Sequence, residues 1–337
     1  MPRLPQELLN LVVEALAIPT RPEAYLNAEI KTLYNLCITS KTLQHFATPH
    51  LYLSIVLSTS HQLHSLVYSL RQTDGIELKR IRSLCLRDFK DALNEDNAAA
   101  MIQLLVLMSN QPSFSRLIID RELRTWISRG DLSDDEEDEG GQASPEDGHE
   151  GHVSDELIAG QRAALCAALE ALPNLRDLHS IQDEVYVAKS WRDPEWNYNR
   201  GWTVHRNLER VTIYNPIVDL DFTAALAKHP NLRQVIMVRP DADDEVSIED
   251  ILKPLERWRE IVIVGHDLVA DNERVKALSN AAASLEHCCK VSFWNIDEID
   301  EKQDPDVIRA IQLAVRDVLE RGQFGDLPLS EAGRRLQ

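Results

Sequence analysis

Two pairs of neighbouring residues combine a histidine with a group that could do chemistry. His266 and Asp267 follow the apolar run 261–264. His287 directly precedes Cys288. A histidine can act as a general base or activate a thiol nucleophile. Neighbours in a strand point to opposite faces, however, and polar pairs after a strand are usually ordinary loop residues. We therefore expect neither pair to be catalytic.

The sequence lacks the short motifs that mark many enzyme and cofactor sites. It contains no G-x-S-x-G nucleophile turn, no H-E-x-x-H zinc site and no glycine-rich phosphate loop. The five cysteines form no C-x-x-C pair; they are Cys37, Cys85, Cys166, Cys288 and Cys289. This odd, scattered set favours a reducing compartment and argues against a metal site. We predict a protein that is not an enzyme and uses no cofactor and no metal.

Charge restricts the partners of the 337-residue chain. Its net charge of −19 disfavours nucleic acid and anionic membranes as partners. Residues 131–156 hold twelve acidic side chains and no Lys or Arg, so this stretch repels itself and cannot pack. We predict a disordered acidic insertion over 130–155. Ser133 precedes three acidic residues and is a possible phosphosite; the alternative is an insertion that is only solvated.

The apolar runs of the chain are short. No eighteen-residue apolar stretch exists, so we expect no membrane span. Glu7 and Glu14 interrupt the first apolar run, which argues against a signal peptide. Together with the cysteine usage, these features predict a cytoplasmic or nuclear protein, or one found in both compartments.

The first fifty residues predict three short helices. Pro5 suits the first turn of a helix whose apolar residues recur at helical spacing as far as Leu16. A second apolar set of the same period starts at Ile30. Ser40 is a plausible N-cap for a third helix, which we expect Pro49 to end. Three short helices cannot bury much apolar surface alone, so we expect them to need a partner.

This opening resembles the fungal type of F-box over residues 2–57. The motifs that carry the likeness are Leu4-Pro5-Gln6-Glu7-Leu8, Leu36-Cys37-Ile38-Thr39-Ser40-Lys41 and Leu51-Tyr52. The resemblance implies that the three helices bind a Skp-type adaptor and, through it, a cullin. The adaptor-binding residues that it implies are Leu4, Pro5, Leu8, Val12, Leu33, Leu36 and Leu51.

A weak repeat follows the helical opening. Seven segments share an apolar-x-x-apolar core, and in all but the third another apolar residue stands two positions later. The segments begin at Ile81, Phe114, Leu175, Leu208, Leu232, Trp258 and Cys288. Successive starts lie 24 to 33 residues apart, except for one interval of 61 that holds the acidic stretch. We predict that each segment is a strand.

Amphipathic helices are predicted between or after these strands, at 98–108, 158–172 and 304–319, the last capped by Asp304. Strands and helices alternating at this period are typical of a leucine-rich-repeat solenoid, with parallel strands on the concave side and helices on the convex side. They resemble the irregular repeats that follow an F-box in fungal proteins. The rival architecture is a doubly wound α/β domain, which would normally carry a glycine-rich loop.

The expected fold class is therefore α/β. We predict an F-box-like helical module over 1–54, a leucine-rich-repeat-like solenoid over 55–321 and a tail over 322–337.

One aromatic segment is a candidate substrate contact. Between positions 191 and 202 the chain is too broken by Pro194 and Gly201 to be helical, so we expect a loop at one rim of the solenoid. Protein interfaces are enriched in Trp, Tyr and Arg. The candidate contact residues are Trp191, Trp196, Tyr198 and Trp202. The alternative is that the tryptophans fold inward and cover the core.

These features predict the substrate-recognition subunit of a Skp–cullin–F-box ubiquitin ligase. The chain would hold an unknown protein substrate near a catalyst that belongs to other subunits, and so raise its effective concentration. The alternative is a leucine-rich-repeat scaffold with a degenerate F-box and no ligase.

Overall fold

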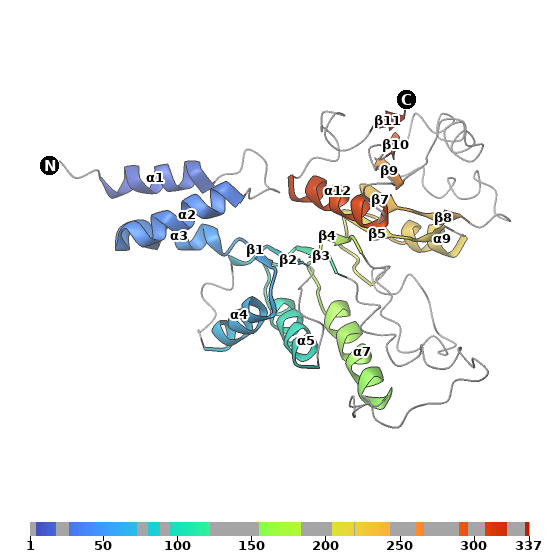
Figure 1. Ribbon diagram of the computed structural model, residues 1–337, viewed down its shortest axis with the longest axis horizontal. Helices are drawn as coiled ribbons and strands as arrows, with labels where there is room; N and C mark the ends of the chain where they lie inside the picture. The colour runs from blue at the N-terminus through green and yellow to red at the C-terminus, as the bar shows by residue number, and fades with distance from the viewer. Residues whose placement is uncertain are drawn as a thin grey trace, which may run out of the picture.

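The computed structural model describes residues 5–17, 27–72, 80–87, 95–121, 155–182, 204–218, 220–242, 260–265, 290–295, 307–321 and 334–336. Three helices come first, and a parallel sheet with helices on both faces follows (Figure 1). The chain is thus a mixed helix-and-strand protein, as expected for the α/β class.

The opening helices are α1 (Gln6–Ala17), α2 (Asn27–Thr39) and α3 (Lys41–Leu51). Ser40 caps α3 as predicted, because its hydroxyl accepts a hydrogen bond of 3.2 Å from the Leu43 N–H. The prediction that Pro49 ends this helix is wrong, since α3 continues to Leu51. Pro49 has no N–H to donate, so one helical hydrogen bond is lost in the last turn. The helical pattern nevertheless resumes, because the Tyr52 N–H donates to the Thr48 carbonyl at 3.3 Å.

The main sheet follows the order of the chain. The described strands are β1 (Ser54–Leu57), β2 (Ser83–Leu86), β3 (Arg116–Ile119), β4 (Asp177–Ser180), β5 (Arg210–Tyr214), β7 (Gln234–Val238), β9 (Glu260–Gly265), β10 (Lys290–Asn295) and β11 (Arg334–Leu336). They lie side by side in that order; β1 to β10 are parallel, and β11 pairs antiparallel with β10. A doubly wound sheet reverses its order, and the described strands do not.

All seven predicted strand segments form strands of this sheet, namely β2, β3, β4, β5, β7, β9 and β10. The first strand, β1, was not predicted. It belongs to an eighth copy of the same pattern, Tyr52-x-x-Ile55-x-Leu57, which starts 29 residues before Ile81. The sheet therefore begins directly after α3.

Successive units are joined by the same hydrogen bonds. The Leu53 carbonyl, just before β1, accepts from the N–H groups of Arg82 and Ser83 at 3.0 and 3.1 Å. The carbonyls of Arg82, Ser115, Arg176 and Glu209 each accept two N–H groups of the next unit in the same way. This recurrence shows that the units share one local geometry despite their different sequences.

Four helices cover one face of the sheet, which we call the outer face: α4 (Ser60–Gln72), α5 (Glu95–Ser109), α7 (Asp155–Glu170) and α9 (Leu220–Ala227). Their apolar stripes pack against alternate strand residues such as Leu84, Leu117 and Val235, all fully buried. This cluster runs from β1 to β9 and forms the larger core of the chain.

The helix α12 (Val307–Arg321) packs on the opposite face, which we call the inner face (Figure 1). Its buried residues are Ile311, Val315, Val318 and Leu319. They join a second apolar cluster with inner-face residues such as Ile118, Ile236 and Val262. The expectation that all helices share one side of the strands is therefore wrong for α12. Its predicted cap, Asp304, lies outside the described residues.

A two-stranded parallel sheet, β6 (Ile217–Val218) with β8 (Asp241–Ala242), extends two of the units. Each short strand follows a residue in the left-handed region, Asn215 at φ 47° and Arg239 at φ 51°. Asparagine tolerates this conformation better than arginine does. The Arg239 Nη1 donates to the Tyr214 hydroxyl at 2.8 Å, and the Arg239 N–H donates to the Val264 carbonyl at 2.7 Å.

Candidate protein-binding surfaces

The three opening helices form a small core of their own. Val13 of α1, Leu33 of α2 and Ala47 of α3 are each fully buried. Partly buried neighbours surround them: Leu36, Cys37, Leu43, Phe46 and Leu51. One side chain from each helix thus fixes the packing of this helical module, which leaves the other helix faces to solvent.

Most exposed apolar side chains of the described residues lie on this module. Six of the ten large ones occur on α1 and α2. On α1 they are Leu8, Leu11, Val12 and Leu16, 40 to 57% exposed, and we call these four the α1 ridge. Their spacing of three, one and four places them on one side of the helix. On α2 they are Tyr34 and Ile38, one turn apart and 58 and 68% exposed. Clustered exposed apolar residues mark interaction surfaces.

The predicted adaptor-binding residues differ in their exposure to solvent. Pro5, Leu8 and Val12 are exposed. Placing Leu33 on a partner-facing surface is wrong, because its side chain is 0% exposed and packs against Val13 of α1 and Ala47 of α3. Leu36 and Leu51 are half-buried and pack against the same core, so little of each remains for a partner. Leu4 lies outside the described residues.

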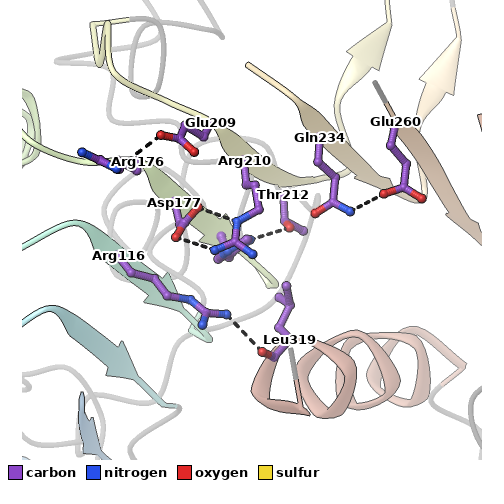
Figure 2. A network of polar contacts seen from close by, with 10 residues as sticks. Arg116, Arg176, Asp177, Glu209, Arg210, Thr212, Gln234, Glu260 and Leu319 are labelled. Carbon is purple, nitrogen blue, oxygen red and sulfur yellow. Dashed lines mark hydrogen bonds and ion pairs between the residues drawn. The ribbon is translucent and has the colours of Figure 1, made fainter. Parts of the chain in front are cut away.

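A row of polar residues crosses the inner face at one register position, where the strands begin. In strand order the row is Ser83, Arg116, Asp177, Arg210, Gln234 and Glu260. Neighbours pair across strands (Figure 2). Arg210 donates two hydrogen bonds of 2.6 and 2.8 Å to the Asp177 carboxylate, and Gln234 donates to Glu260 at 2.7 Å. These two pairs join neighbouring strands and help to fix their register.

His179 lies one step further along the inner face and is fully shielded from solvent. A hydrogen bond of 2.8 Å joins its Nδ1 to the Thr212 hydroxyl. Burial lowers the pKa of His179 well below its usual range, and the positive charges of Arg116 and Arg210 lower it further. A histidine bonded to a hydroxyl can be a base and its nucleophile. Thr212 is 0% exposed, however, so no substrate reaches this pair, and its role is structural.

The docked helix α12 is tied to the sheet at two polar points. The Arg116 Nη2 donates to the Leu319 carbonyl at 3.0 Å, so a cation meets the negative end of the helix dipole (Figure 2). Arg316 of α12 approaches Asp120 at 3.5 Å, and Gln182 donates to the same carboxylate at 2.6 Å. Burial raises the pKa of Asp120, while Gln182 and Arg316 act in the opposite direction.

Several predicted sites lie outside the described residues. They are Ser133 and the acidic stretch, the aromatic contacts Trp191, Trp196, Tyr198 and Trp202, and the His266-Asp267 and His287-Cys288 pairs. Among the residues that are described, no group of three acidic, histidine or cysteine side chains could hold a metal ion. Within the same ranges, no helix combines the length and apolar character needed to cross a membrane.

Sequence reasoning missed the polar row, although a signal for it exists. In each of the seven predicted segments, the residue just before the second apolar position is polar, as in Arg116, Asp177 and Arg210. A fixed polar position inside an otherwise apolar strand indicates a face that is not purely core. The side of the sheet that α12 covers has no comparable signal.

Comparison with known proteins leaves the family open. A scan against protein-family models finds no model that matches the chain, and a search of curated proteins finds no similar protein.

Proposed function

We propose that this chain is a non-catalytic protein-recognition subunit whose helical module binds a Skp-type adaptor. The observation that carries the proposal is the α1 ridge, an apolar surface left exposed by a helix whose other side is already packed. It coincides with the segment that resembles an F-box, including Leu8 and Val12. Through the adaptor the chain would join a cullin and act as a substrate receptor of a ubiquitin ligase.

The α1 ridge is large enough to matter energetically. Fully burying a leucine or valine side chain contributes about 1.5–3 kcal/mol. The four ridge residues are 40 to 57% exposed, so about half of that gain is still open to each of them. Covering all four would contribute roughly 3–6 kcal/mol. A central group of a few apolar anchors is how protein interfaces usually concentrate their energy.

The sheet, in this proposal, is a leucine-rich-repeat-type solenoid that presents an unknown protein substrate. Parallel strands in chain order and a recurring hydrogen-bond pattern between units support this assignment. Ubiquitin transfer would belong to the associated RING protein and conjugating enzyme. The chain would act by effective concentration, in the cytoplasm, the nucleus or both.

Co-purification tests the proposal. The tagged full chain is co-expressed with a Skp-type adaptor, and the adaptor retained is measured for wild type, Leu8→Asp and Val106→Asp. Val106 is the matched control, because it is 46% exposed on α5 and Leu8 is 47% exposed on α1. We expect Leu8→Asp to reduce the retained adaptor at least tenfold and Val106→Asp to leave it unchanged.

A wild-type chain that retains no adaptor would contradict the ligase assignment and leave a repeat scaffold with a degenerate helical module. Equal retention by Leu8→Asp and wild type would show that the α1 ridge is not the contact surface.

A further inference from the structure

The surface under α12 differs in composition from the rest of the core. Two charged side chains of the inner face, Arg116 and Asp120, are buried and contact α12 directly. His179 and Thr212 are buried on the same face, and Gln312 is buried on α12 itself. Cores rarely hold charged groups unless they are paired, and protein–protein interfaces combine an apolar centre with directed polar contacts. In composition, α12 is thus bound to the inner face as one protein binds another.

The larger core is complete without α12. The outer-face cluster runs from Leu57 to Ile263 and includes residues of α4, α5, α7 and α9, but none of α12. The cluster that includes α12 is separate and smaller. The two contacts that tie α12 down span 203 residues between Arg116 and Leu319 and 196 between Asp120 and Arg316. The helix therefore reaches the inner face from the far end of the chain.

We propose that the inner face is a docking surface for an amphipathic helix and that α12 is its resident, intramolecular occupant. The helix that fits has the α12 pattern, with apolar residues at the positions of Ile311, Val315, Val318 and Leu319 and an arginine at the position of Arg316. The arginine meets Asp120, and the carboxyl end of the helix meets Arg116. A partner helix of this chemistry binds by displacing α12. This inference is independent of the adaptor-binding function.

The arrangement makes binding conditional. An attached helix competes at a high effective concentration, so a free partner helix binds only when it is abundant or when α12 is weakened. The inner face is therefore not available to apolar ligands that bind weakly. A partner helix that pairs with Asp120 more closely than the 3.5 Å of Arg316 would gain an advantage in the exchange.

Cys85 offers a direct readout of α12 release. Its side chain is 4% exposed and belongs to the inner-face cluster that α12 covers. In the full-length chain, the other four cysteines are replaced by alanine, so that a maleimide dye reports on Cys85 alone. Val315→Asp then places a carboxylate in the centre of the α12 contact. A synthetic peptide of residues 305–322 is the probe added in trans.

Three results are expected. Val315→Asp raises the labelling rate of Cys85 at least tenfold while circular dichroism shows that the sheet and the outer helices are retained. The native peptide then restores protection of Cys85 in this variant, and the peptide carrying Val315→Asp does not. An Arg316→Glu peptide binds about fivefold more weakly than the native peptide, because its ion pair with Asp120 is partly exposed.

Other results overturn the inference. Global unfolding of the Val315→Asp chain would show that α12 is an integral part of the core and cannot be exchanged. Continued protection of Cys85 in a folded Val315→Asp chain would show that α12 does not shield the inner face. Failure of the native peptide to restore protection would show that the surface does not recognise a separate helix. The milder Val318→Ala, which should raise labelling severalfold, separates local release from general destabilisation.

Discussion

The helical module should respond in opposite ways to the loss of two leucines that the F-box resemblance treats alike. Leu33 is 0% exposed at the centre of the module, and Leu8 is 47% exposed on the α1 ridge. Each is replaced by alanine in the full chain. Leu33→Ala should open the module and affect adaptor binding only through stability, whereas Leu8→Ala should weaken adaptor binding and leave the module closed.

The magnitudes follow from burial. Removing a fully buried leucine side chain costs about 2–5 kcal/mol, because the lost transfer free energy is joined by a cavity term. Leu8 is half exposed and leaves no cavity, so Leu8→Ala should cost about 1 kcal/mol or less. Factors of ten correspond to 1.4 kcal/mol, so Leu33→Ala should increase the opening equilibrium roughly 30- to several-thousand-fold.

Native-state hydrogen exchange of the α2 amides measures this opening directly. Exchange should accelerate by these factors in Leu33→Ala and by no more than about fivefold in Leu8→Ala. The amides of β7, far from the module in sequence, serve as an internal control and should not change. Equal acceleration in the two variants, or less than fivefold in Leu33→Ala, would refute the assignment of Leu33 to the core.

Further predictions concern the inner face. Burial lowers the pKa of His179, so the unfolded chain takes up a proton at pH values where the folded chain does not. Lowering the pH from 7.5 to 5.5 should therefore cost wild type more unfolding free energy than His179→Gln, as urea titrations would show. Equal losses would contradict a neutral buried histidine. Asp177→Asn should cost roughly 1–3 kcal/mol, and the double change with Arg210→Gln should cost less than the sum in the same titrations, since the two residues share their hydrogen bonds; additive costs would argue against coupling. Arg116→Met should raise Cys85 labelling severalfold by removing the bond to the Leu319 carbonyl, and an unchanged rate would argue that this bond does not hold α12.

Much of the sheet could be predicted because its pattern is local. Residues such as Leu117 and Val211 recur at fixed offsets inside each strand, and the pattern alone places seven strands correctly. The strand β1 is hard to predict because Tyr52, which opens its pattern, also belongs to the Leu51-Tyr52 motif at the end of the helical module. The Ser40 cap was also predictable, since its hydrogen bond involves a residue only three positions away.

The rest depends on contacts distant in sequence. Periodicity identifies an apolar stripe on α12, but it does not show which sheet face the stripe contacts. The structure shows this through contacts such as the hydrogen bond from Arg116 to the Leu319 carbonyl, which joins residues 203 positions apart. The same limit explains Leu33. Helical spacing groups it with other apolar residues of α2, and only the positions of Val13 and Ala47 show that it points inward.

Calorimetric titration of the purified full chain with a purified Skp-type adaptor tests the central claim most directly. Leu11 is the informative position, because it is 57% exposed on the α1 ridge. We predict one-to-one binding with a negative heat-capacity change for wild type, and at least tenfold weaker binding for Leu11→Asp with the same melting temperature. No binding by wild type, or equal affinity for Leu11→Asp, would contradict the claim that this ridge is an adaptor-binding surface.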